Sequence, residues 1–253
     1  MSNIIEIRNL SFEYEKDIKV LNGLDLSIEA NTINAILGAN GSGKSTLLDC
    51  LIGINKPLEG EIKIESKRVD DYTNREFAKK LAYISQSVSI NIDYSVREFI
   101  LFGRSPYLPI GKGPGEADYI KCNEYAEKLG ITHLLGKSIT KISGGERQLC
   151  FICRALIQES DVMVFDEPMS ALDFGNQSKL LKIFSDLQTE GKTIVFTTHN
   201  PNQVLDLNCN VIVLDEGKVA CFGKAESVIT KELLEKIYKR PFGEAKKHYT
   251  FES

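Results

Sequence analysis

An eight-residue pattern near the N-terminus constrains the fold more than any other feature of the chain. Residues 38–45 read Gly-Ala-Asn-Gly-Ser-Gly-Lys-Ser, and they follow an apolar run at 33–37. The residues from 45 to 53 have the apolar spacing of a helix that stops at Gly53. A strand, the pattern G-x-x-x-x-G-K-[ST] and a helix form a P-loop, which predicts a parallel sheet covered by helices.

Each part of this loop has a physical reason to bind phosphate. Its glycines let the backbone curl until successive N–H groups point inward, and the helix N-terminus adds partial positive charge. The Lys44 ammonium suits the β- and γ-phosphates, and the Ser45 hydroxyl suits Mg²⁺. A glycine-rich turn that matched by chance would need neither the strand nor the helix. We therefore expect ATP and Mg²⁺ as cofactors, held by Gly38, Asn40, Gly41, Ser42, Gly43, Lys44, Ser45 and Thr46.

Two acids follow a second apolar strand. Residues 162–165 are wholly apolar, and Asp166 and Glu167 come next. Ligands of parallel sheets collect beyond the carboxyl ends of the strands. We expect Asp166 to enter the Mg²⁺ shell and Glu167 to act as general base on a water molecule. Acids after a strand can also simply begin a loop, but the P-loop in the same chain favours the catalytic role.

A second glycine-containing segment opens a predicted helix. Ser143-Gly144-Gly145-Glu146 has the spacing of a capping box. A capped helix alone needs no pair of glycines, whereas close approach of the backbone to a phosphate does. The segment therefore predicts a second anion-binding site, although one triphosphate does not obviously need two.

The remaining segments indicate an α/β core with an antiparallel β-subdomain at the N-terminus and a helical subdomain inserted after the P-loop. The first thirty residues alternate apolar and polar side chains, as half-exposed antiparallel strands do. EGEIKIESKRV at 59–69 predicts one further exposed strand. A short strand, a helix and three more strands are predicted at about 79–86, 175–189, 193–197, 211–214 and 218–223.

Between about 88 and 157 the chain changes character. SVREFILFG at 95–103 predicts a helix, and RSPYLPIGKGPGEAD at 104–118 predicts a loop, because it is rich in proline and glycine. Residues 116–129 predict a helix that ends at Gly130. We interpret 88–157 as a helical subdomain inserted into a single domain that spans 1–253.

The composition excludes several classes of function. The net charge is −4 with both signs interspersed, which disfavours nucleic-acid binding by bulk electrostatics. No run of about 18 apolar residues predicts a membrane span, and the N-terminus does not resemble a secretory signal. The cysteines are then expected to be reduced thiols in the cytosol. Cys150 and Cys153 form a lone C-x-x-C, which predicts two buried thiols on one helix face instead of a zinc site.

Together these motifs resemble the ATP-binding-cassette (ABC) ATPases over nearly the whole chain, from Tyr14 to about Phe242. In that family, the ISGGE-type signature of one subunit closes over the γ-phosphate held by the P-loop of another. The resemblance implies a head-to-tail homodimer around two ATP molecules, which would explain the second anion-binding segment. It rests on the P-loop, Gln86 after a strand, ISGGERQ at 142–148, VMVFDEP at 162–168, SALD at 170–173 and His199.

The resemblance also assigns roles at matching positions. Tyr14 would stack on adenine, with an aromatic of a small core as the alternative. Gln86 would contact Mg²⁺ and the attacking water, and Asp173 would bridge the two subunits. His199 would bind the γ-phosphate and help to position water and Glu167; an isolated histidine is more often structural, but this one ends an apolar strand.

Two positions depart from the family pattern. Residue 142 is Ile where Leu is usual, and residue 169 is Met where Thr is usual. The first change conserves side-chain volume, and neither removes the Mg²⁺ ligand or the base, so we expect hydrolysis to persist. His133 and His248 lack comparable context and stay unassigned.

Further resemblance points to transport. The segments at 95–107, 170–177 and 196–207 resemble those of ATPases that serve importers of iron–siderophore complexes, haem, cobalamin and related metal chelates or oxyanions. Such a chain would act at the cytoplasmic face of the membrane with separate permease subunits, and indirectly with a substrate-binding protein. The helix at 95–103 and the loop at 104–115 are the expected permease contacts, with an ordinary exposed loop as the alternative.

Two other functions stay open. A soluble ABC ATPase of iron–sulfur cluster assembly would have a similar size and a soluble scaffold as its partner. DNA-repair members carry coiled-coil insertions and translation members usually carry two cassettes, and the sequence shows neither. A small-molecule kinase is the third candidate, but kinases position an acceptor and do not activate water in this way.

Overall fold

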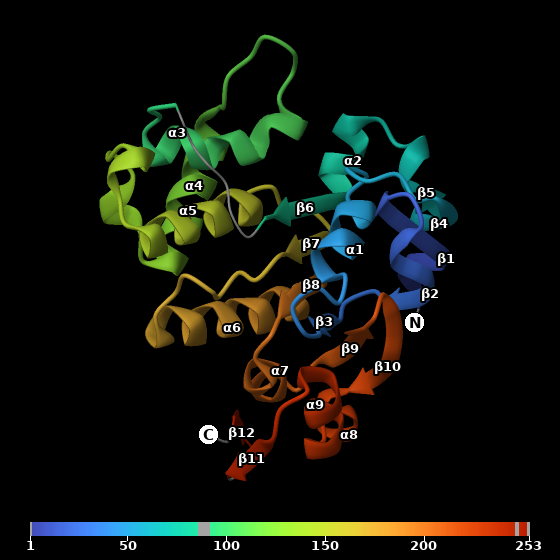
Figure 1. The fold of residues 1–253 in the computed structure, drawn as a ribbon. Coiled ribbons are helices and arrows are strands. Elements are labelled where there is room, and N and C mark those ends of the chain that lie inside the picture. The colour runs from blue at the N-terminus through green and yellow to red at the C-terminus, as the bar shows by residue number, and fades with distance from the viewer. Residues whose placement is uncertain (1, 86–91, 246–247, 252–253) are drawn as a thin grey trace. The chain divides into compact units, whose positions relative to one another are not determined.

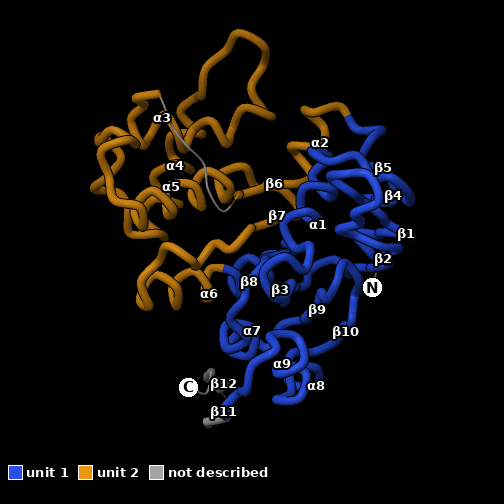
Figure 2. Tube along the Cα trace, viewed as in Figure 1, with its two compact units in different colours: residues 1–72, 184–253 blue, residues 73–183 orange. Residues whose placement is uncertain are grey.

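A computed structural model of the chain describes residues 2–85, 92–245 and 248–251. Its contacts divide the chain into two compact units (Figure 2). Unit 1 comprises Met1–Tyr72 and Phe184–Ser253, and unit 2 comprises Thr73–Ile183. Among the described residues, no helix combines the length and apolar character needed to cross a bilayer.

Unit 1 begins with an antiparallel sheet in the strand order β2-β1-β4-β5 (Figure 1). Its strands are β1 (Asn3–Glu15), β2 (Ile18–Glu29), β4 (Glu59–Ile64) and β5 (Lys67–Arg68). In β2, the buried side chains Leu24, Leu26 and Ile28 alternate with exposed ones. This period of two buries one face of the strand and leaves the other in water. The expected half-exposed antiparallel strands at the N-terminus are therefore confirmed.

The sequence predicted a single strand over 59–69, and this prediction is wrong in one respect. The structure has a hairpin there, because β4 pairs with β5 through a turn at Glu65 and Ser66. Both turn residues have positive φ, 48° and 65°, the backbone that matches the twist of a two-residue hairpin. Neither residue is the Gly or Asn that usually marks such a turn, so the sequence pattern did not reveal it.

The parallel strands of unit 1 bring the carboxyl ends of two neighbouring strands to the same edge of the sheet. They are β3 (Ile33–Leu37), β8 (Thr193–Thr198) and β9 (Asn210–Asp215), and β3 pairs in parallel with both of the others. Every residue of β3 is buried, as expected of a central strand with both faces covered. Leu37 lies opposite Thr198, so residues 38 and 199 leave the sheet at the same edge. Strand β10 (Lys218–Lys224), which the sequence predicted as a strand, pairs antiparallel with β9.

The helices of unit 1 are short. Helix α1 (Lys44–Leu51) follows the P-loop, and α7 (Pro201–Leu207) follows β8. The chain continues through α8 (Ala225–Val228), α9 (Lys231–Tyr238) and the hairpin of β11 (Phe242–Ala245) with β12 (His248–Phe251). The sequence reading did not anticipate α7, α8, α9 or this hairpin. Elements of four to eight residues carry too few turns for periodicity to identify them.

Unit 2 combines two parallel strands with several helices. Strands β6 (Leu81–Ile84) and β7 (Val162–Phe165) pair in parallel. The helices are α2 (Asn74–Lys80), α3 (Val96–Leu101), α4 (Glu116–Leu129) and α5 (Gly144–Leu156), and α6 (Phe174–Thr189) runs on into unit 1. Capping boxes begin α2, α3 and α5, and Gly130 with φ 73° ends α4, so local chemistry fixes these boundaries. Short 3-10 helices also occur. They are η1 (Val69–Asp71) in unit 1, and η3 (Thr132–Leu134) and η4 (Ile139–Lys141) in unit 2.

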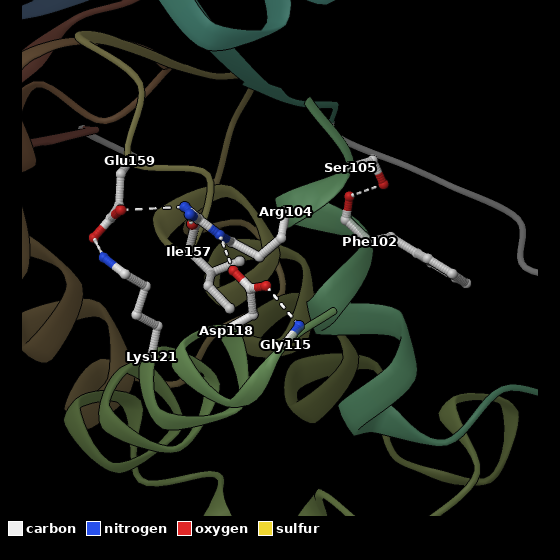
Figure 3. A network of polar contacts seen from close by, with 8 residues as sticks. All are labelled: Phe102, Arg104, Ser105, Gly115, Asp118, Lys121, Ile157 and Glu159. Atoms are coloured by element: carbon white, nitrogen blue, oxygen red, sulfur yellow. Dashed lines mark hydrogen bonds and ion pairs between the residues drawn. The ribbon is translucent and has the colours of Figure 1, made fainter. Parts of the chain in front are cut away.

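The segment predicted as a loop from residue 104 begins inside a 3-10 helix, η2 (Phe102–Tyr107). A polar network centred on the buried Arg104 holds it there (Figure 3). Arg104 donates from Nε to Asp118 at 2.8 Å, and from Nη1 to the Ile157 carbonyl at 2.8 Å and to Glu159 at 3.1 Å. Lys121 also pairs with Glu159. Since these partners come from distant parts of the chain, composition alone predicted a loop.

Burial explains the C-x-x-C of helix α5. Cys150 and Cys153 are both fully buried within α5, and burial raises the pKa of Cys150 to about 12. Such thiols stay protonated and behave as small apolar groups. Among the described residues, no cluster of three or more His, Cys, Asp or Glu side chains could hold a metal. The prediction that both thiols are buried on one helix is confirmed.

Candidate functional site

The P-loop joins the end of β3 to the start of α1 within unit 1. Its glycines are required by their surroundings. A methyl group on Gly38 would lie 2.5 Å from the Leu214 carbonyl oxygen and from Ser42 Oγ. Gly43 has φ 101° and would press a side chain onto Leu21 at 3.0 Å. Gly41 has φ 79° with open space around it, so its backbone conformation is what requires glycine.

The polar side chains of the loop are prepared for an anion. Lys44 is 7 % exposed and donates from Nζ to the carbonyls of Gly38 and Ala39, at 2.8 and 3.0 Å. Ser42 Oγ is buried and has no hydrogen-bond partner among the described residues. A buried hydroxyl without a partner is costly in a folded protein. A buried ammonium and an unsatisfied hydroxyl beside a helix N-terminus together fit a phosphate ligand.

The rest of the loop divides into exposed and buried positions. Asn40, Gly41 and Ser45 are exposed, so they can reach a bound group, whereas Thr46 is buried. Thr46 Oγ1 lies 3.2 Å from the hydroxyl of Tyr14. The structure thus brings a strand-borne aromatic next to the first turn of α1.

Tyr14 does not belong to a small core, because 62 % of it is exposed. Its ring meets Phe12 edge to face at a centroid distance of 4.9 Å. Its hydroxyl lies near Thr46 and accepts from Asn55 Nδ2 at 3.4 Å. An exposed aromatic ring tied to the P-loop helix has the placement that a base-stacking role needs.

His199 follows β8 at the sheet edge where the P-loop also begins. It is exposed, and the residues on either side of it are held in place. Thr198 Oγ1 donates to Gln203 at 2.7 Å and accepts from the Asn200 N–H at 3.0 Å. The side chain of Asn200 caps helix α7 by accepting from Asn202. Unit 1 therefore brings Tyr14 close to residues 38–46, and it places His199 beyond the strand next to β3.

Asp166 and Glu167 lie in unit 2, directly after β7. Asp166 is buried, and its N–H donates to the Ile84 carbonyl at the end of β6, 2.8 Å away. Glu167 has φ 44°. A bulky residue in the left-handed region is strained, and such strain tends to collect at functional positions. The structure thus places both acids beyond the carboxyl ends of two parallel strands, as the sequence predicted.

Glutamine side chains hold the segment that follows these acids. Gln148 of α5 donates to the Pro168 carbonyl at 3.2 Å. Gln177 of α6 donates to the carbonyls of Met169 and Leu172, at 3.2 and 2.9 Å. Asp173 accepts from the backbone and side chain of Asn176, at 2.9 and 3.0 Å.

The Ser143 segment forms the capping box that its sequence predicts. Ser143 accepts from the Glu146 N–H, and Glu146 Oε2 accepts from the Ser143 N–H at 2.8 Å. These hydrogen bonds hold the pKa of the Glu146 carboxyl below its usual range. Gly144 is surrounded by open space, whereas a methyl on Gly145 would lie 3.1 Å from the Ala171 carbonyl oxygen. Gly145 therefore has a packing reason inside the subunit, and the phosphate role of Gly144 stays a prediction.

Other predicted positions have simpler outcomes. Gln86 lies outside the described residues. The two departures from the family pattern, Ile142 and Met169, are buried apolar side chains at 7 % and 3 % exposure. Sequence reasoning gave no role to Gln148, Gln177 or Thr198, because their hydrogen bonds join residues that only the fold brings together.

Comparison with known proteins identifies the family. A family model described as "ABC transporter" matches residues 21–170, more than half of the chain. The chain belongs to the ABC transporter family of ATP-binding proteins. ABC subunits of this kind are ATPases, and so is this chain. A second family model, an AAA domain, matches only residues 137–206.

Individual relatives agree with this ABC assignment. The molybdate import ATP-binding protein MolC of Haemophilus influenzae is 34 % identical, covering 98 % of this chain and 93 % of its own. The ferric enterobactin transport ATP-binding protein FepC of Escherichia coli is 33 % identical over 87 % and 81 %. A solved structure described as a metal-chelate type ABC transporter, in an inward-facing conformation, has TM-score 0.83 and 32 % identity, covering 100 % and 98 %. The expected α/β ABC fold is thereby confirmed.

Proposed function

We propose that this chain powers an importer of a metal chelate, haem or a related oxyanion by hydrolysing ATP. One observation supports the ATP-binding step most directly. The P-loop contains both a buried ammonium, that of Lys44, and a buried hydroxyl without a hydrogen-bond partner in the described part of the chain, that of Ser42. A triphosphate would give the Ser42 hydroxyl an acceptor, and its negative charge would suit the Lys44 ammonium. The exposed ring of Tyr14 would then stack on the adenine.

Magnesium and water complete the proposed site. Ser45, Asp166 and Gln86 would hold Mg²⁺, whose preference is for oxygen ligands. Glu167 would take a proton from the attacking water, and His199 would bind the γ-phosphate. Glu167 follows Asp166 at the end of β7 and so lies beyond the carboxyl ends of two parallel strands, which supports its role as the base.

The second half of each site would come from another copy of the chain. Ser143 and Gly144 are exposed at the N-terminus of a thirteen-residue helix, where backbone N–H groups can meet a phosphate. We propose a head-to-tail homodimer in which Ser143, Gly144, Gly145 and Glu146 cover the γ-phosphate of the partner's nucleotide. Asp173 would bridge the two subunits.

Separate membrane subunits would be the transport partner. In unit 2, the loop after η2 carries Ile110, which is 97 % exposed, and next to it Pro109, Leu108 and Arg75 line a shallow groove. Burying an almost fully exposed apolar side chain against a partner would remove its apolar surface from water. This loop and helix α3 are the proposed permease contacts, at the cytoplasmic face of the membrane, and a substrate-binding protein would take part indirectly.

The relatives favour import over the soluble alternative. Their names include molybdate import, ferric enterobactin transport, hemin import and petrobactin import. A cluster-assembly ATPase is not favoured, because these relatives are named as transport proteins. The cargo proposed is accordingly a metal chelate, haem or an oxyanion such as molybdate.

A substitution at the base tests the catalytic proposal. Glu167→Gln should still bind ATP, should hydrolyse it roughly 10²- to 10⁴-fold more slowly, and should accumulate as a dimer when ATP is present. Size-exclusion chromatography and phosphate release measure both effects. Glu127→Gln on the exposed side of α4 is the matched control and should behave as wild type. A Glu167→Gln variant that stays monomeric with ATP would contradict the proposed dimer.

Co-purification tests the transport proposal. The tagged chain should retain a polytopic membrane protein from detergent-solubilised membranes. Ile110→Asp should weaken this retention while the isolated chain keeps its ATPase rate. Ile18→Asp, at a position in unit 1 that is also exposed (60 %), is the control and should retain the partner. Retention of a soluble scaffold protein instead would favour the cluster-assembly alternative.

A further inference from the structure

A tyrosine near the C-terminus reaches the backbone of His199. The hydroxyl of Tyr238 donates to the His199 carbonyl oxygen at 3.0 Å, across thirty-nine positions of the sequence. Both residues belong to unit 1. The sequence motifs end well before Tyr238, and the site described above does not use it.

The position of Tyr238 is itself fixed. It is the last residue of α9, which buries Leu234 and Ile237. Its ring packs against Phe242 at a centroid distance of 5.6 Å, and Phe242 is 1 % exposed. The Phe242 N–H donates to Glu235 at 3.2 Å. The hydroxyl therefore projects from a packed C-terminal segment and not from a loose tail.

The contacts around His199 fall on three consecutive residues. Thr198 Oγ1 joins the Asn200 N–H to Gln203, the Asn200 side chain caps α7, and Tyr238 holds the carbonyl of His199 itself. The first two are local contacts made by the segment with itself. The Tyr238 hydrogen bond is different, because it ties this segment to a separate part of the chain.

We infer that Tyr238 is a positioning residue for His199 in ATP hydrolysis. The inference rests on the proposed contact of His199 with the γ-phosphate. Fixing the peptide plane at His199 limits where its imidazole can lie, and small displacements of a positioned group have large effects on rate. Loss of the hydroxyl should therefore lower the rate of the chemical step and spare ATP binding, which depends on the P-loop.

The test removes one oxygen atom from the full-length protein. Tyr238→Phe keeps the ring on Phe242 and removes the hydrogen bond. We expect kcat to fall roughly three- to tenfold, the size of effect of one hydrogen bond, with little change in KM for ATP. The matched control is Tyr72→Phe, because the Tyr72 hydroxyl also donates to a backbone carbonyl, that of Ile64 at 2.7 Å. The control should keep the wild-type kcat.

A double-mutant cycle separates the possible failures. If Tyr238 acts through His199, adding Tyr238→Phe to His199→Ala should cause no further loss of kcat. Further loss in the double variant, or a wild-type kcat in Tyr238→Phe while His199→Ala is impaired, would overturn the inference. A wild-type kcat in His199→Ala would instead refute the proposed role of His199.

A spectroscopic readout covers the case of a damaged fold. The imidazole resonances of His199, assigned in NMR spectra by comparison with His199→Ala, should shift in Tyr238→Phe and stay unchanged in Tyr72→Phe. A similar loss of thermal stability in both tyrosine variants, with equal loss of kcat, would show a merely structural role. That result would also overturn the inference.

Discussion

The hydroxyl of Ser42 should destabilise the fold without nucleotide and strengthen the binding of ATP. Its buried hydroxyl lacks a partner among the described residues. Ser42→Ala should therefore raise the free energy of unfolding without nucleotide by about 1 kcal/mol. The same change should weaken ATP binding roughly tenfold, because it removes a phosphate donor. Urea unfolding measures the first effect, and calorimetric titration with Mg-ATP measures the second.

Ser11 provides the control, since it is equally buried but satisfied. Its Oγ accepts from the Gly23 N–H at 3.0 Å. Ser11→Ala should lower the free energy of unfolding by about 1 kcal/mol, because the hydrogen bond from the Gly23 N–H is lost, and should leave ATP affinity unchanged. If Ser42→Ala behaves like Ser11→Ala in both measurements, the hydroxyl of Ser42 has a structural partner and no role at the phosphate.

At the scale of elements, two serines that cap helices allow a structural role to be distinguished from a functional one. Ser143 and Ser95 begin α5 and α3 with the same capping box. Replacing either with Ala should cost about 1 kcal/mol of stability. Only Ser143→Ala should also slow ATP hydrolysis, because only that helix is proposed to face a phosphate. Equal ATPase rates for the two variants would argue that the Ser143 segment is simply a capped helix.

The network that holds η2 should make part of the stability depend on pH. Burial would raise the pKa of Asp118, but hydrogen bonds from Gly115 and Arg104 and the charges of Arg104 and Lys121 outweigh it and lower the pKa. A carboxyl with a lowered pKa stabilises the fold above its ordinary value of 3.8, and this contribution disappears as the pH falls through the lower folded-state value. Asp118→Asn should therefore lose roughly 2 kcal/mol at neutral pH, the size of a hydrogen bond to a charged group, and progressively less below pH 3.8.

An exposed ion pair is the control for this effect. Asp70 lies 3.9 Å from Arg68, and both side chains are about half exposed. Asp70→Asn should change the free energy of unfolding by less than about 0.5 kcal/mol at any pH. Chemical denaturation at several pH values measures both variants. A constant difference between Asp118→Asn and wild type across the acidic range would contradict the lowered pKa.

Elements were predictable where local chemistry determines them. The helix at Glu116–Leu129 was predicted with its stop at Gly130, and the capping box at Ser143 predicted the start of α5. The turn at residues 65–66 and the 3-10 helix over Phe102–Tyr107 were not predicted. The first uses positive φ at residues that rarely adopt it, and the second depends on Arg104 partners far away in the sequence. Candidate site residues could likewise be proposed from the sequence where they follow strands or form glycine loops, whereas the contacts of Gln148, Gln177 and Tyr238 are created only by the fold.

At the scale of the whole molecule, the proposed function requires two copies of the chain. Each copy carries one P-loop, in unit 1, and one Ser143 segment, in unit 2. In a symmetric dimer with shared sites, every site would combine the P-loop of one copy with the Ser143 segment of the other. A defect in either element alone would disable both sites of a homodimer, although each copy retains half of what a site needs.

Mixing two inactive variants therefore tests the shared site directly. Lys44→Ala should lose phosphate binding, and Ser143→Arg should bind ATP as a monomer but not hydrolyse it. In a mixed dimer, the intact P-loop of the Ser143→Arg copy meets the intact Ser143 segment of the Lys44→Ala copy, which restores one of the two sites. Single-turnover hydrolysis should thus reappear on mixing and be absent from either variant alone. If each subunit instead completed its own site, no mixture could recover activity, since every copy would carry one defect.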